Sequence, residues 1–486
     1  MRQRTAIVIG GGIGGLAAAL ALDRRGWSVT VLERTAGPVP APASGRRAQT
    51  APPARSGAGI GLAPNAQRAL DTLGLGDAVR AMAAWQGAGE LRLPGGRRLA
   101  RTDNAAAVRR FGGPVMVAHR AELLALLAGR LPDGALRTGA AAELVDPGEP
   151  GPGGRPARVR IAAAADCATG TDGATATDGT CATDGSAASD GTSATDGATA
   201  TDGTAATDGP AATEEGAGGP AGADEELTAD LVVGADGIHS AVRRAVFPGH
   251  PEPRYAGFTA WRFVVPAPER PCTAHETWGP GGLWGTVPLP DGRIYAYATA
   301  AVPPGGRAAD DERAELLRRF GTWHRPVPDL IAAADPATVL RNDVRTAAAP
   351  PPAFHRGRVA LLGDAVHPMT PNLGQGGCQA IEDAVVLAQL AAPDADLAAA
   401  LAEFTRQRLP RTMDVVRRAE RIGRLTTWRS RPACALRAVL MAATARLTPD
   451  LALRALDGIA DWRPEGPTYA AGTRGTRTAA QPKEHE

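Results

Sequence analysis

The chain has 486 residues, of which 44% are hydrophobic, so it can form two or more domains around a large core. Its formal net charge of +2 argues against a protein that binds nucleic acid through general electrostatic attraction. Its five cysteines are scattered without a C-x-x-C pair, which indicates neither a zinc site nor a disulfide framework, and we expect no metal site.

The first predicted unit is a strand, a glycine turn and a helix. A short apolar run leads into Gly10-Gly11-Gly12-Ile13-Gly14-Gly15, an alanine-rich helical stretch follows, and a second strand ends at Glu33. Gly10, Gly12 and Gly15 fit G-x-G-x-x-G, whose glycines permit a tight turn, the approach of a pyrophosphate and close packing of helix on strand. Glu33 follows at the distance where a ribose hydroxyl needs an acceptor. The unit predicts a dinucleotide site but does not say which dinucleotide binds.

A surface loop and two short helices are expected next. Residues 35–56 are rich in Pro, Ala and Arg, which is typical of a loop after the second strand. Residues 65–73 predict a helix that Asn65 caps, and residues 121–131 predict another, introduced by His119-Arg120.

A repeat interrupts the chain between residues 167 and 226. Thr-Asp-Gly recurs there with a period of six, and its glycines fall at 173, 179, 185, 191, 197, 203 and 209. No position of the repeat carries a large apolar residue, so burial cannot offset the entropy of ordering and we expect disorder. We interpret the repeat as a lengthened hairpin turn between a strand at 157–163 and a strand at 230–233.

Two buried strands far apart in the chain each lead to an aspartate. One strand, at 229–234, precedes Asp236-Gly237, and the other, at 358–362, precedes Gly363-Asp364. Each aspartate alone fits a turn or a cap, but the carboxyl ends of strands in a doubly wound sheet are where ligands bind. Two such ends beside a dinucleotide fingerprint favour a shared site. The glycine-rich stretch at 371–377 then opens a helix, whose free N–H groups stabilise negative charge.

Residues 255–300, between these two strands, predict a β-sheet, because aromatic and polar residues alternate and turn signals separate them. The aromatic residues concerned are Tyr255, Phe258, Trp261, Phe263, Trp278, Trp284, Tyr295 and Tyr297. Two interpretations stay open: an ordinary half-buried sheet, or a sheet that lines an apolar pocket for a flat substrate.

The rest of the chain is predicted to be mostly helical, over 311–334 and 396–460, with a frayed tail after Trp462. Residues 404–431 carry nine arginines, which fits a solvated helix face partly paired with acids, or a surface for a membrane or a partner. No stretch has the apolar richness of a membrane span, and the first strand begins too early to leave room for a signal peptide. We expect a cytoplasmic protein without integral membrane association.

Together these motifs resemble the group A FAD-dependent aromatic monooxygenases, which have the fold of para-hydroxybenzoate hydroxylase. The similarity is closest to the branch of salicylate hydroxylase, zeaxanthin epoxidase and urate hydroxylase. It covers residues 4–35, 57–165 and 227–465. The motifs that carry it, in the order of the family, are the glycine turn, Gly57–Asn65, His119-Arg120, Asp236-Gly237 and residues 363–379. The repeat and the long loop after Glu33 are departures from the family pattern.

The resemblance implies an α/β fold in which a Rossmann-like FAD-binding domain is assembled from discontinuous segments. The implied division is an FAD-binding domain at 1–85, 110–165, 227–250 and 355–395, a β-sheet substrate domain at 86–109 and 251–354, the repeat at 167–226, a helical region at 396–465 and a flexible tail at 466–486.

The resemblance also implies which residues hold FAD: the glycine turn for the pyrophosphate, Glu33 for the adenosine ribose, Arg120 for the ribose–phosphate region, Asp364 for the ribityl or pyrophosphate part, and residues 371–376 for the flavin ring. The full implied set is Gly10, Gly12, Ile13, Gly14, Gly15, Glu33, Arg34, Arg120, Asp236, Gly363, Asp364, Pro371, Leu373, Gly374, Gln375 and Gly376. Arg262 and His367 are candidates for orienting or polarising the substrate, and a solvated or core role fits each at least as well.

The implied reaction is a monooxygenation. NADPH or NADH, as a transient co-substrate, reduces FAD, dioxygen adds to give a flavin hydroperoxide, and an aromatic or polycyclic small molecule is hydroxylated or epoxidised. The alternatives are a flavin reductase or halogenase on a related fold, and a non-catalytic flavin-binding partner protein. The sole lysine, Lys483, lies in the tail, which disfavours a halogenase because those enzymes need a lysine near the flavin. Both a monomer and a homodimer stay open.

Overall fold

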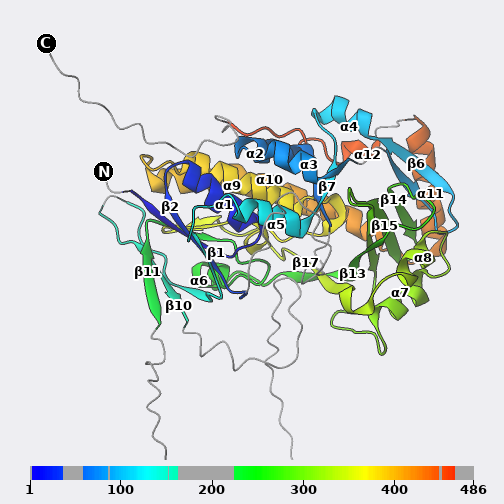
Figure 1. Cartoon of the computed structure of the whole chain (residues 1–486), viewed down its shortest axis with the longest axis horizontal. Helices are drawn as coiled ribbons and strands as arrows, with labels where there is room; N and C mark the ends of the chain where they lie inside the picture. Colours follow the sequence, from blue (N-terminus) through cyan, green and yellow to red (C-terminus); the bar gives the residue numbers. More distant parts are fainter. Residues whose placement is uncertain are drawn as a thin grey trace, which may run out of the picture.

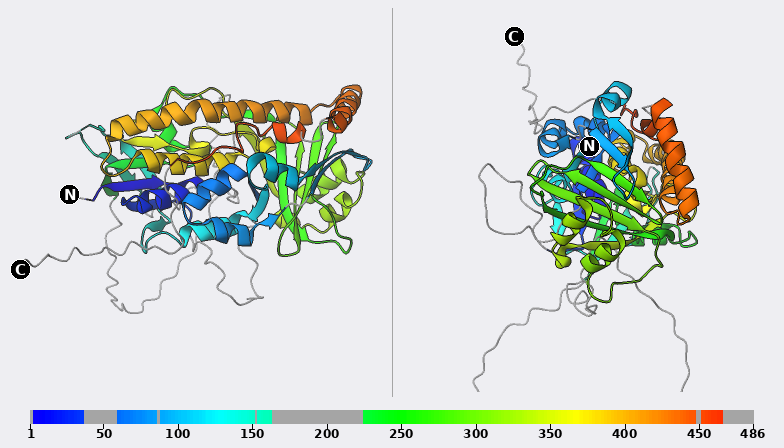
Figure 2. Two further views of the ribbon diagram at one scale, coloured as in Figure 1. Left: turned by 90° about the horizontal axis from the view of Figure 1, so that it is seen from above. Right: turned by 90° about the vertical axis from the view of Figure 1, so that its right-hand side faces the viewer.

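The computed structural model describes residues 3–36, 59–85, 88–151, 153–162, 224–447 and 451–465. Two large sheets stand towards opposite ends of an elongated body (Figure 1). The long helix α10 (Leu397–Thr426) runs along most of that body (Figure 2). Most of the predicted loop at 35–56, most of the repeat and the tail from 466 lie outside the described residues.

A six-stranded sheet forms the core of one end. Its order is β18–β19–β12–β1–β2–β8, and all neighbours pair in parallel except β18 and β19. Its bounds are β1 (Thr5–Ile9), β2 (Ser28–Glu33), β8 (Leu136–Thr138), β12 (Leu231–Gly234), β18 (His355–Arg356) and β19 (Val359–Leu361). The central strands are apolar and almost wholly buried, as parallel strands covered on both faces usually are. The predicted α/β, Rossmann-like fold is confirmed.

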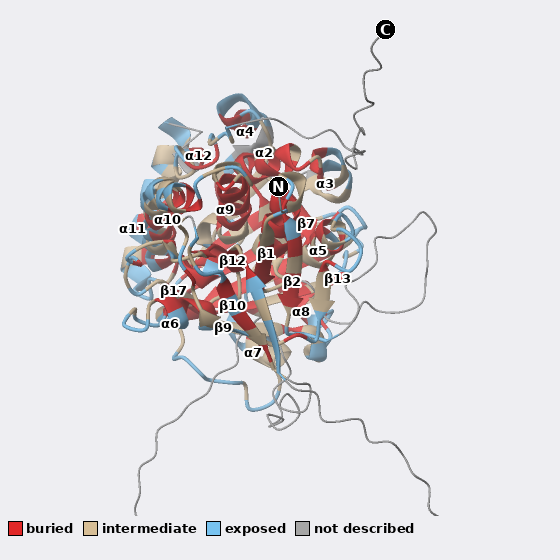
Figure 3. Ribbon diagram, turned by 90° about the vertical axis from the view of Figure 1, so that its left-hand side faces the viewer, coloured by how far each residue is buried: buried red, intermediate tan, exposed pale blue. Residues whose placement is uncertain are grey.

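Helix α9 (Gly376–Leu390) is the central helix of the layer on this sheet. It packs against α1 (Ile13–Arg24), α2 (Pro64–Thr72) and α10, and α1 also packs against α5 (Arg120–Ala128). Figure 3 shows α2 and α9 on one side of β1 and β12, with β9 and β10 on the other. The apolar positions predicted for α9, from Cys378 to Ala388, are buried. Segments from both ends of the sequence therefore share one core.

A three-stranded antiparallel sheet corrects the predicted hairpin. In it, β10 (Ala157–Ile161) pairs with β9 (Ala142–Asp146) and with β11 (Glu225–Ala229). The strand predicted as the partner is instead β12 of the parallel sheet. The end that we predicted for the repeat, at about residue 226, overlaps the first two residues of β11. β11 contains only one large apolar residue, Leu227, so its sequence does not predict a strand. The strand conformation of β11 depends on pairing with β10.

A seven-stranded sheet forms the other end of the body and confirms the strands predicted over 255–300. Its order is β17–β13–β16–β15–β14–β5–β6. Its bounds are β5 (Ala88–Arg92), β6 (Arg98–Asp103), β13 (Arg254–Pro266), β14 (His275–Gly279), β15 (Gly282–Pro288), β16 (Arg293–Ala300) and β17 (Leu340–Thr346). Trp261, Phe263 and Trp284 form a buried cluster with α7 (Glu312–Phe320) and α8 (Val327–Ala332). These three aromatic residues belong to an ordinary core.

The remaining elements connect these layers. A small sheet has the order β3–β7–β4, with bounds β3 (Gly59–Leu62), β4 (Ala84–Trp85) and β7 (Met116–His119). The other helices are α3 (Gly76–Met82), α4 (Asn104–Phe111), α6 (Ala241–Val246), α11 (Arg431–Leu447) and α12 (Leu451–Arg454), with short 3-10 turns η1 (Pro336–Thr338), η2 (Gly363–Ala365) and η3 (Pro371–Leu373). The helix predicted at 65–73 exists, but Asn65 does not cap it: Ala63 stands at the cap position.

Replacing residues 163–223 with a short Asn-Gly turn should preserve the fold. Ile161 and Glu225 are already cross-strand partners, so a tight turn can close the same hairpin. We expect the melting temperature to stay within about 3 °C of the full chain. A matched deletion that also removes β11 should destabilise the protein clearly. Equal melting temperatures for the two deletions, measured by circular dichroism, would contradict the role of β11.

Candidate functional site

Four adjacent parallel strands bring the predicted residues to one edge. In the order β19–β12–β1–β2, the carboxyl ends lead to Gly363-Asp364, Asp236, Gly10 and Glu33. Because parallel strands end at the same edge of a sheet, segments separated by hundreds of residues meet there. The strand order places these segments at one edge of the sheet, and that they form a shared ligand site stays a prediction.

In the glycine turn, two positions must be glycine for the fold to form, whereas a third has free space around it. Gly10 has a φ of +110°, and a Cβ there would lie 2.4 Å from the carbonyl oxygen of Ala235. A Cβ on Gly15 would lie 2.0 Å from the carbonyl oxygen of Gly10. A Cβ on Gly12, in contrast, would meet no atom within 4 Å. Gly10 and Gly15 hold strand and helix together, whereas Gly12 keeps an open space at the start of α1.

The same helix start presents backbone donors. Gly12 is the N-cap of α1, and no side chain accepts a hydrogen bond there. Ile13 and Gly14 follow in the first turn, where N–H groups lack partners within the helix. These groups can bind an anion such as a pyrophosphate.

Glu33 is held in place by backbone donors. The Gly11 N–H donates to Glu33 Oε2 at 2.7 Å, and the Thr35 N–H donates to Oε1 at 2.8 Å. The carboxylate thus lies beside the glycine turn, where the sequence predicted an acceptor. The neighbouring Arg34 is exposed.

Asp236 has a local structural role. Ser240 Oγ donates to its Oδ1 at 2.5 Å, and the Val242 N–H donates to its Oδ2 at 3.1 Å, so its carboxylate helps to cap α6. Its main chain lies against the glycine turn, because a Cβ on Gly10 would be 3.1 Å from the Asp236 Cα. The cap interpretation that the sequence left open is the one that the hydrogen bonds support.

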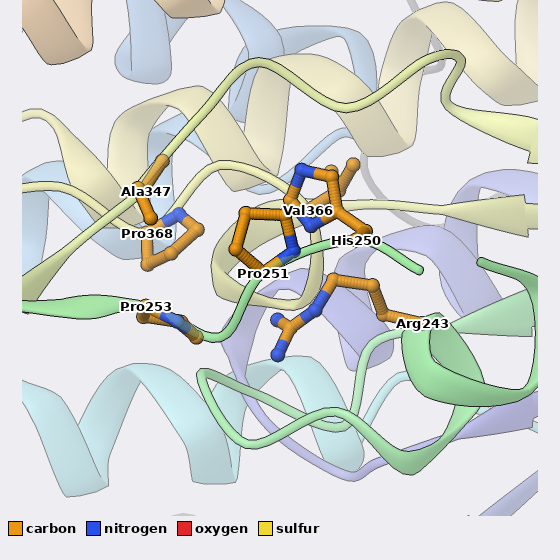
Figure 4. Close-up of a pocket in the computed structure, with 8 residues that line it drawn as sticks. Arg243, His250, Pro251, Pro253, Ala347, Val366 and Pro368 are labelled. Atoms are coloured by element: carbon orange, nitrogen blue, oxygen red, sulfur yellow. The ribbon is translucent and has the colours of Figure 1, made fainter. Parts of the chain in front are cut away.

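Arg243 fastens the β12 end to the β19 end. Its guanidinium is buried and donates to the carbonyl oxygens of Ile238, at 3.1 Å, and Ala365, at 3.0 Å. It also forms an ion pair with Glu252 at 2.8 Å. The side chain lines a small cavity with His250, Val366 and prolines (Figure 4). This residue was not predicted from the sequence, because neither of the adjacent arginines of this short helix, Arg243 and Arg244, carries a sign of burial in the sequence.

The segment after Asp364 keeps open space near that aspartate. Asp364 is exposed in η2, and its Oδ1 would lie 3.9 Å from a Cβ on Gly376. Pro371 and Leu373 form η3, and Gly374 then takes a left-handed conformation with a φ of +63°. A Cβ on Gly374 would meet no atom within 4 Å. Gln375 is the N-cap of α9 but makes no side-chain cap, so this helix start also presents free N–H groups.

Arg120 begins α5, directly after His119, and is half-buried. Its guanidinium makes no hydrogen bond or ion pair that is recorded within the described part of the chain. The preceding residue, His119, lines a cavity of about 280 Å³ together with Glu122, Asp291 and others.

A buried ion-pair network lies behind the 371–376 loop. Arg408 donates to Asp383 Oδ1 at 2.7 Å and to Glu382 Oε2 at 2.6 Å, and all three side chains are at most 1% exposed. Arg411 also donates to Glu382, at 2.8 Å. Although burial opposes ionisation of Asp383, the charges of His367 and Arg408 outweigh it and lower its pKa to about 2. The Asp383–Arg408 pair therefore stays charged at neutral pH.

Amide side chains extend this network to the loop. Asn65 Nδ2 donates to Glu382 Oε1 at 2.6 Å and to Gln375 Oε1 at 3.0 Å. Gln379 Nε2 donates to Glu382 Oε1 at 3.0 Å. Gln375, the residue that opens α9, is thereby tied to α2 and to the ion pairs. An acidic pair inside an apolar helix face was the signal that could have revealed this network, because buried carboxylates need partners.

His367 belongs to the network. Its ring is fully buried, its Nε2 lies 2.5 Å from Asp383 Oδ2, and it stacks on Phe354 with ring centroids 5.8 Å apart. Asp383 Oδ2 also accepts the Gly363 N–H at 3.0 Å, so this pair braces the η2 turn. These contacts favour the core role that the sequence left open for His367.

Arg262 lies on the face of the seven-stranded sheet opposite the tryptophan cluster. It is half-buried and pairs in register with Tyr297 of β16. On the same face, the Tyr295 ring lies against β3, where a Cβ on Gly59 would be 2.6 Å from its Cδ1. This face therefore looks towards β3 and the start of α9. Of the predicted aromatic residues, Tyr295 and Tyr297 lie on this face, and the pocket interpretation stays a prediction for this face alone.

A carboxylate organises this face. Tyr297 Oη donates to Glu276 Oε1 at 2.6 Å, and Trp278 Nε1 donates to Oε2 at 2.9 Å. Burial and the nearby Glu276 raise the pKa of Tyr297 well above its ordinary value, so the phenol stays protonated. Gly285 makes room for the Tyr297 ring, since a Cβ there would lie 2.0 Å from the Tyr297 Cζ.

The described residues contain no group of three or more His, Cys, Asp or Glu side chains that could hold a metal ion. No helix among them is long and apolar enough to cross a bilayer.

Residues 184–419 match the family described as "FAD binding domain", and residues 8–68 match a "NAD(P)-binding Rossmann-like domain". The chain is 35% identical to the aurachin C monooxygenase/isomerase of Stigmatella aurantiaca over 439 residues, which cover 90% of this chain and 93% of that protein. It is 31% identical over 460 residues to the 3-amino-4-hydroxybenzoate 2-monooxygenase of Streptomyces cremeus, covering 90% of this chain and 91% of that protein.

A solved structure of similar fold is Klebsiella pneumoniae HpxO complexed with FAD and uric acid. The TM-score is 0.67 at 27% identity, and the match covers 94% of this chain and 96% of that one.

Replacing Arg408 with Met should destabilise the protein by about 3–5 kcal/mol, because two buried carboxylates lose their shared cation. The matched control is Arg406→Met on the same helix, whose partner Glu403 is solvent-accessible, and it should leave the unfolding free energy close to that of the wild type. Adding Glu382→Gln and Asp383→Asn to Arg408→Met should recover part of the loss. Urea unfolding curves measure all three, and equal losses for Arg408→Met and Arg406→Met would contradict the assignment.

Proposed function

The chain belongs to the FAD-dependent monooxygenases that act on aromatic compounds, and from that premise we propose that its FAD binds along the carboxyl ends of β19, β12, β1 and β2. One observation carries the proposal: the starts of α1 and α9, neither of which has a side-chain cap, lie along this row of strand ends. Beside them, Gly12 and Gly374 leave open space. An elongated dinucleotide with a central pyrophosphate fits this combination of donors and space.

We assign the cofactor residues by their place on this edge. Gly10 to Gly15 receive the pyrophosphate, Glu33 and Arg34 the adenosine end, and Arg120 the ribose–phosphate region. Asp236 acts through its main chain, since its carboxylate caps α6. Gly363 and Asp364 serve the ribityl–pyrophosphate part, and the loop from Pro371 through Leu373, Gly374, Gln375 and Gly376 borders the flavin ring.

The domain roles follow from the same assignment. We propose that residues 1–85, 110–165, 227–250 and 355–395 bind the cofactor and that residues 86–109 and 251–354 bind the substrate. Support comes from the two sheets, which separate along these segments.

The bound flavin supplies the redox chemistry, accepting hydride from NAD(P)H and activating dioxygen. The protein binds and orients the reactants. We propose that Arg262 orients the substrate on the sheet face that looks towards β3, with Tyr297 and Glu276 as fixed polar groups behind it. We assign His367 a positioning role, because its imidazole reaches the η2 turn through Asp383 and its backbone N–H donates to the Gly363 carbonyl oxygen at 2.9 Å. Relatives named for aurachin C and 3-amino-4-hydroxybenzoate support an aromatic small-molecule substrate.

Gly12→Ala and Gly15→Ala should separate cofactor binding from folding. The Gly12 methyl group meets no protein atom and has an ordinary φ of −72°, so the apoprotein should fold normally while the methyl group fills the space for the pyrophosphate. We expect the FAD dissociation constant, measured by flavin fluorescence, to rise at least about tenfold. Gly15→Ala clashes with Gly10 and should lower the melting temperature of the apoprotein. Unchanged FAD affinity in Gly12→Ala would contradict the assigned cradle.

The activity is tested with a panel of aromatic compounds on the FAD-loaded protein. A substrate should stimulate NAD(P)H oxidation and give a product that carries one oxygen atom from labelled dioxygen. Arg262→Met should raise the KM for that substrate about tenfold, as expected for the loss of a charged contact, while the exposed Arg325→Met should not change it. A panel that yields only hydrogen peroxide, with no labelled product, would argue against the proposed function, and an unchanged KM would argue against the role of Arg262.

A further inference from the structure

Helix α11 presents its apolar side to solvent. Leu436, Val439 and Leu440 are 60%, 60% and 56% exposed, and Leu447 at its end is 84% exposed. Val439 and Leu440 follow Leu436 by three and four residues, and Leu447 follows Leu440 by seven. This spacing places all four in one stripe along the helix. The opposite side, with Cys434, Arg437 and Ala438, is buried. A surface helix of a protein that only faces water normally has the reverse arrangement, so this stripe needs a partner.

The exposed apolar residues are concentrated near this helix. Leu425 and Trp428, 38% and 40% exposed, directly precede it. Among the described residues, the other large hydrophobic residues with comparable exposure are Val108 and Leu317, on α4 and α7. The stripe is therefore a local feature of the 425–447 segment.

The charges around the stripe have one sign. Residues 421–447 contain six arginines and no Asp, Glu or Lys. All the arginines except Arg437 are exposed: Arg421, Arg424, Arg429, Arg431 and Arg446. On the preceding part of α10, in contrast, arginines alternate with acidic partners, as in the Arg406–Glu403 and Arg418–Asp414 pairs. The paired-face interpretation fits α10 as far as Arg424, which lies 3.4 Å from Glu420, whereas residues 425–447 carry four arginines and no acidic residue.

We propose that the α11 face, formed by Leu436, Val439, Leu440 and Leu447 with the flanking Arg431 and Arg446, docks on an anionic lipid bilayer surface. An exposed apolar stripe flanked by arginine, with a tryptophan nearby, has the composition of a helix that lies in the membrane interface. Its 17 residues give a contact about 25 Å long, parallel to the surface. The contact is peripheral, which agrees with a set of described helices that contains no membrane span.

The positive charge of this face favours an anionic bilayer over a second copy of the chain as its partner. A symmetric dimer through this face would bring the same arginines of both copies together, with no acidic residue in 421–447 to neutralise them. Anionic headgroups provide that neutralisation, and each arginine near them adds to the affinity.

The docking face is connected to the substrate sheet. The Arg437 guanidinium, on the buried side of α11, lies 5.4 Å from the centre of the Trp278 ring, and Trp278 donates to Glu276. α11 also packs against β6 at the edge of the sheet, and Figure 2 shows it on the outside of the molecule, at the end of α10. Docking would therefore bring the substrate-binding end of the molecule to the membrane.

The test is flotation of the full-length, FAD-loaded protein with vesicles. The probes are vesicles of phosphatidylcholine alone and vesicles with about 30% phosphatidylglycerol. We expect at least about tenfold stronger partitioning to the anionic vesicles, and weaker partitioning at high salt. The double variant Leu436→Gln, Leu440→Gln should lose at least about tenfold of this partitioning. Both positions are exposed, so the variant should keep the wild-type melting temperature, and Leu317→Gln on α7 is the matched control.

Three results would overturn the proposal. One is no flotation of the wild type with either vesicle, and another is undiminished flotation of the double variant. The third comes from sedimentation in the absence of lipid: a wild-type dimer that the double variant converts to a monomer would make this face a self-association surface. FAD absorbance and turnover are measured on the same samples, so loss of membrane binding with intact activity separates this proposal from the proposed function.

Discussion

The Glu382–Asp383–Arg408 ion-pair network is the constraint on which the candidate site depends. It joins α9 to α10, reaches α2 through Asn65 and braces the η2 turn through the Asp383 contact with Gly363. Buried charges cost stability unless they are paired, so the network favours the arrangement of these elements in which Glu382, Asp383 and Arg408 meet. That arrangement fixes where the 371–376 loop and the end of β19 stand relative to the glycine turn.

Much of the cofactor edge could be predicted from the sequence, because its signals are local. The glycine turn, the apolar strands and the carboxylates that follow them each occupy a few consecutive residues. The partners of those carboxylates could not be predicted, since Asn65, Asp383 and Arg408 meet only in the folded chain. Asp236 and His367 illustrate the difference. The sequence makes Asp236 a candidate for the cofactor and His367 a candidate for the substrate, and only the contacts show that one caps a helix and the other stacks in the core.

The seven-stranded sheet shows a second limit of sequence reasoning. Alternation along β13 predicts two faces, but it cannot say which face meets helices and which meets another part of the chain. Trp261 and Phe263 pack on α7 and α8, so the aromatic residues that are most prominent in the sequence belong to the core. The face with Arg262 and Tyr297 is defined by its approach to β3, which precedes it by about two hundred residues. The strand β11 was missed for a related reason, because its conformation depends on pairing rather than on its own composition.

The order of strands β19–β12–β1–β2 also governs when the protein can mature during its synthesis. The glycine turn leaves the ribosome first, but β12, the neighbour of β1, follows only after residue 230, and β19 and α9 after residue 358. A nascent chain therefore carries an incomplete nucleotide edge, with one side of β1 unpaired, until most of its length has emerged. At the site proposed for FAD, cofactor capture would thus be a late, essentially post-translational event. Truncated products that contain the complete glycine fingerprint would still lack half of the edge to which it belongs.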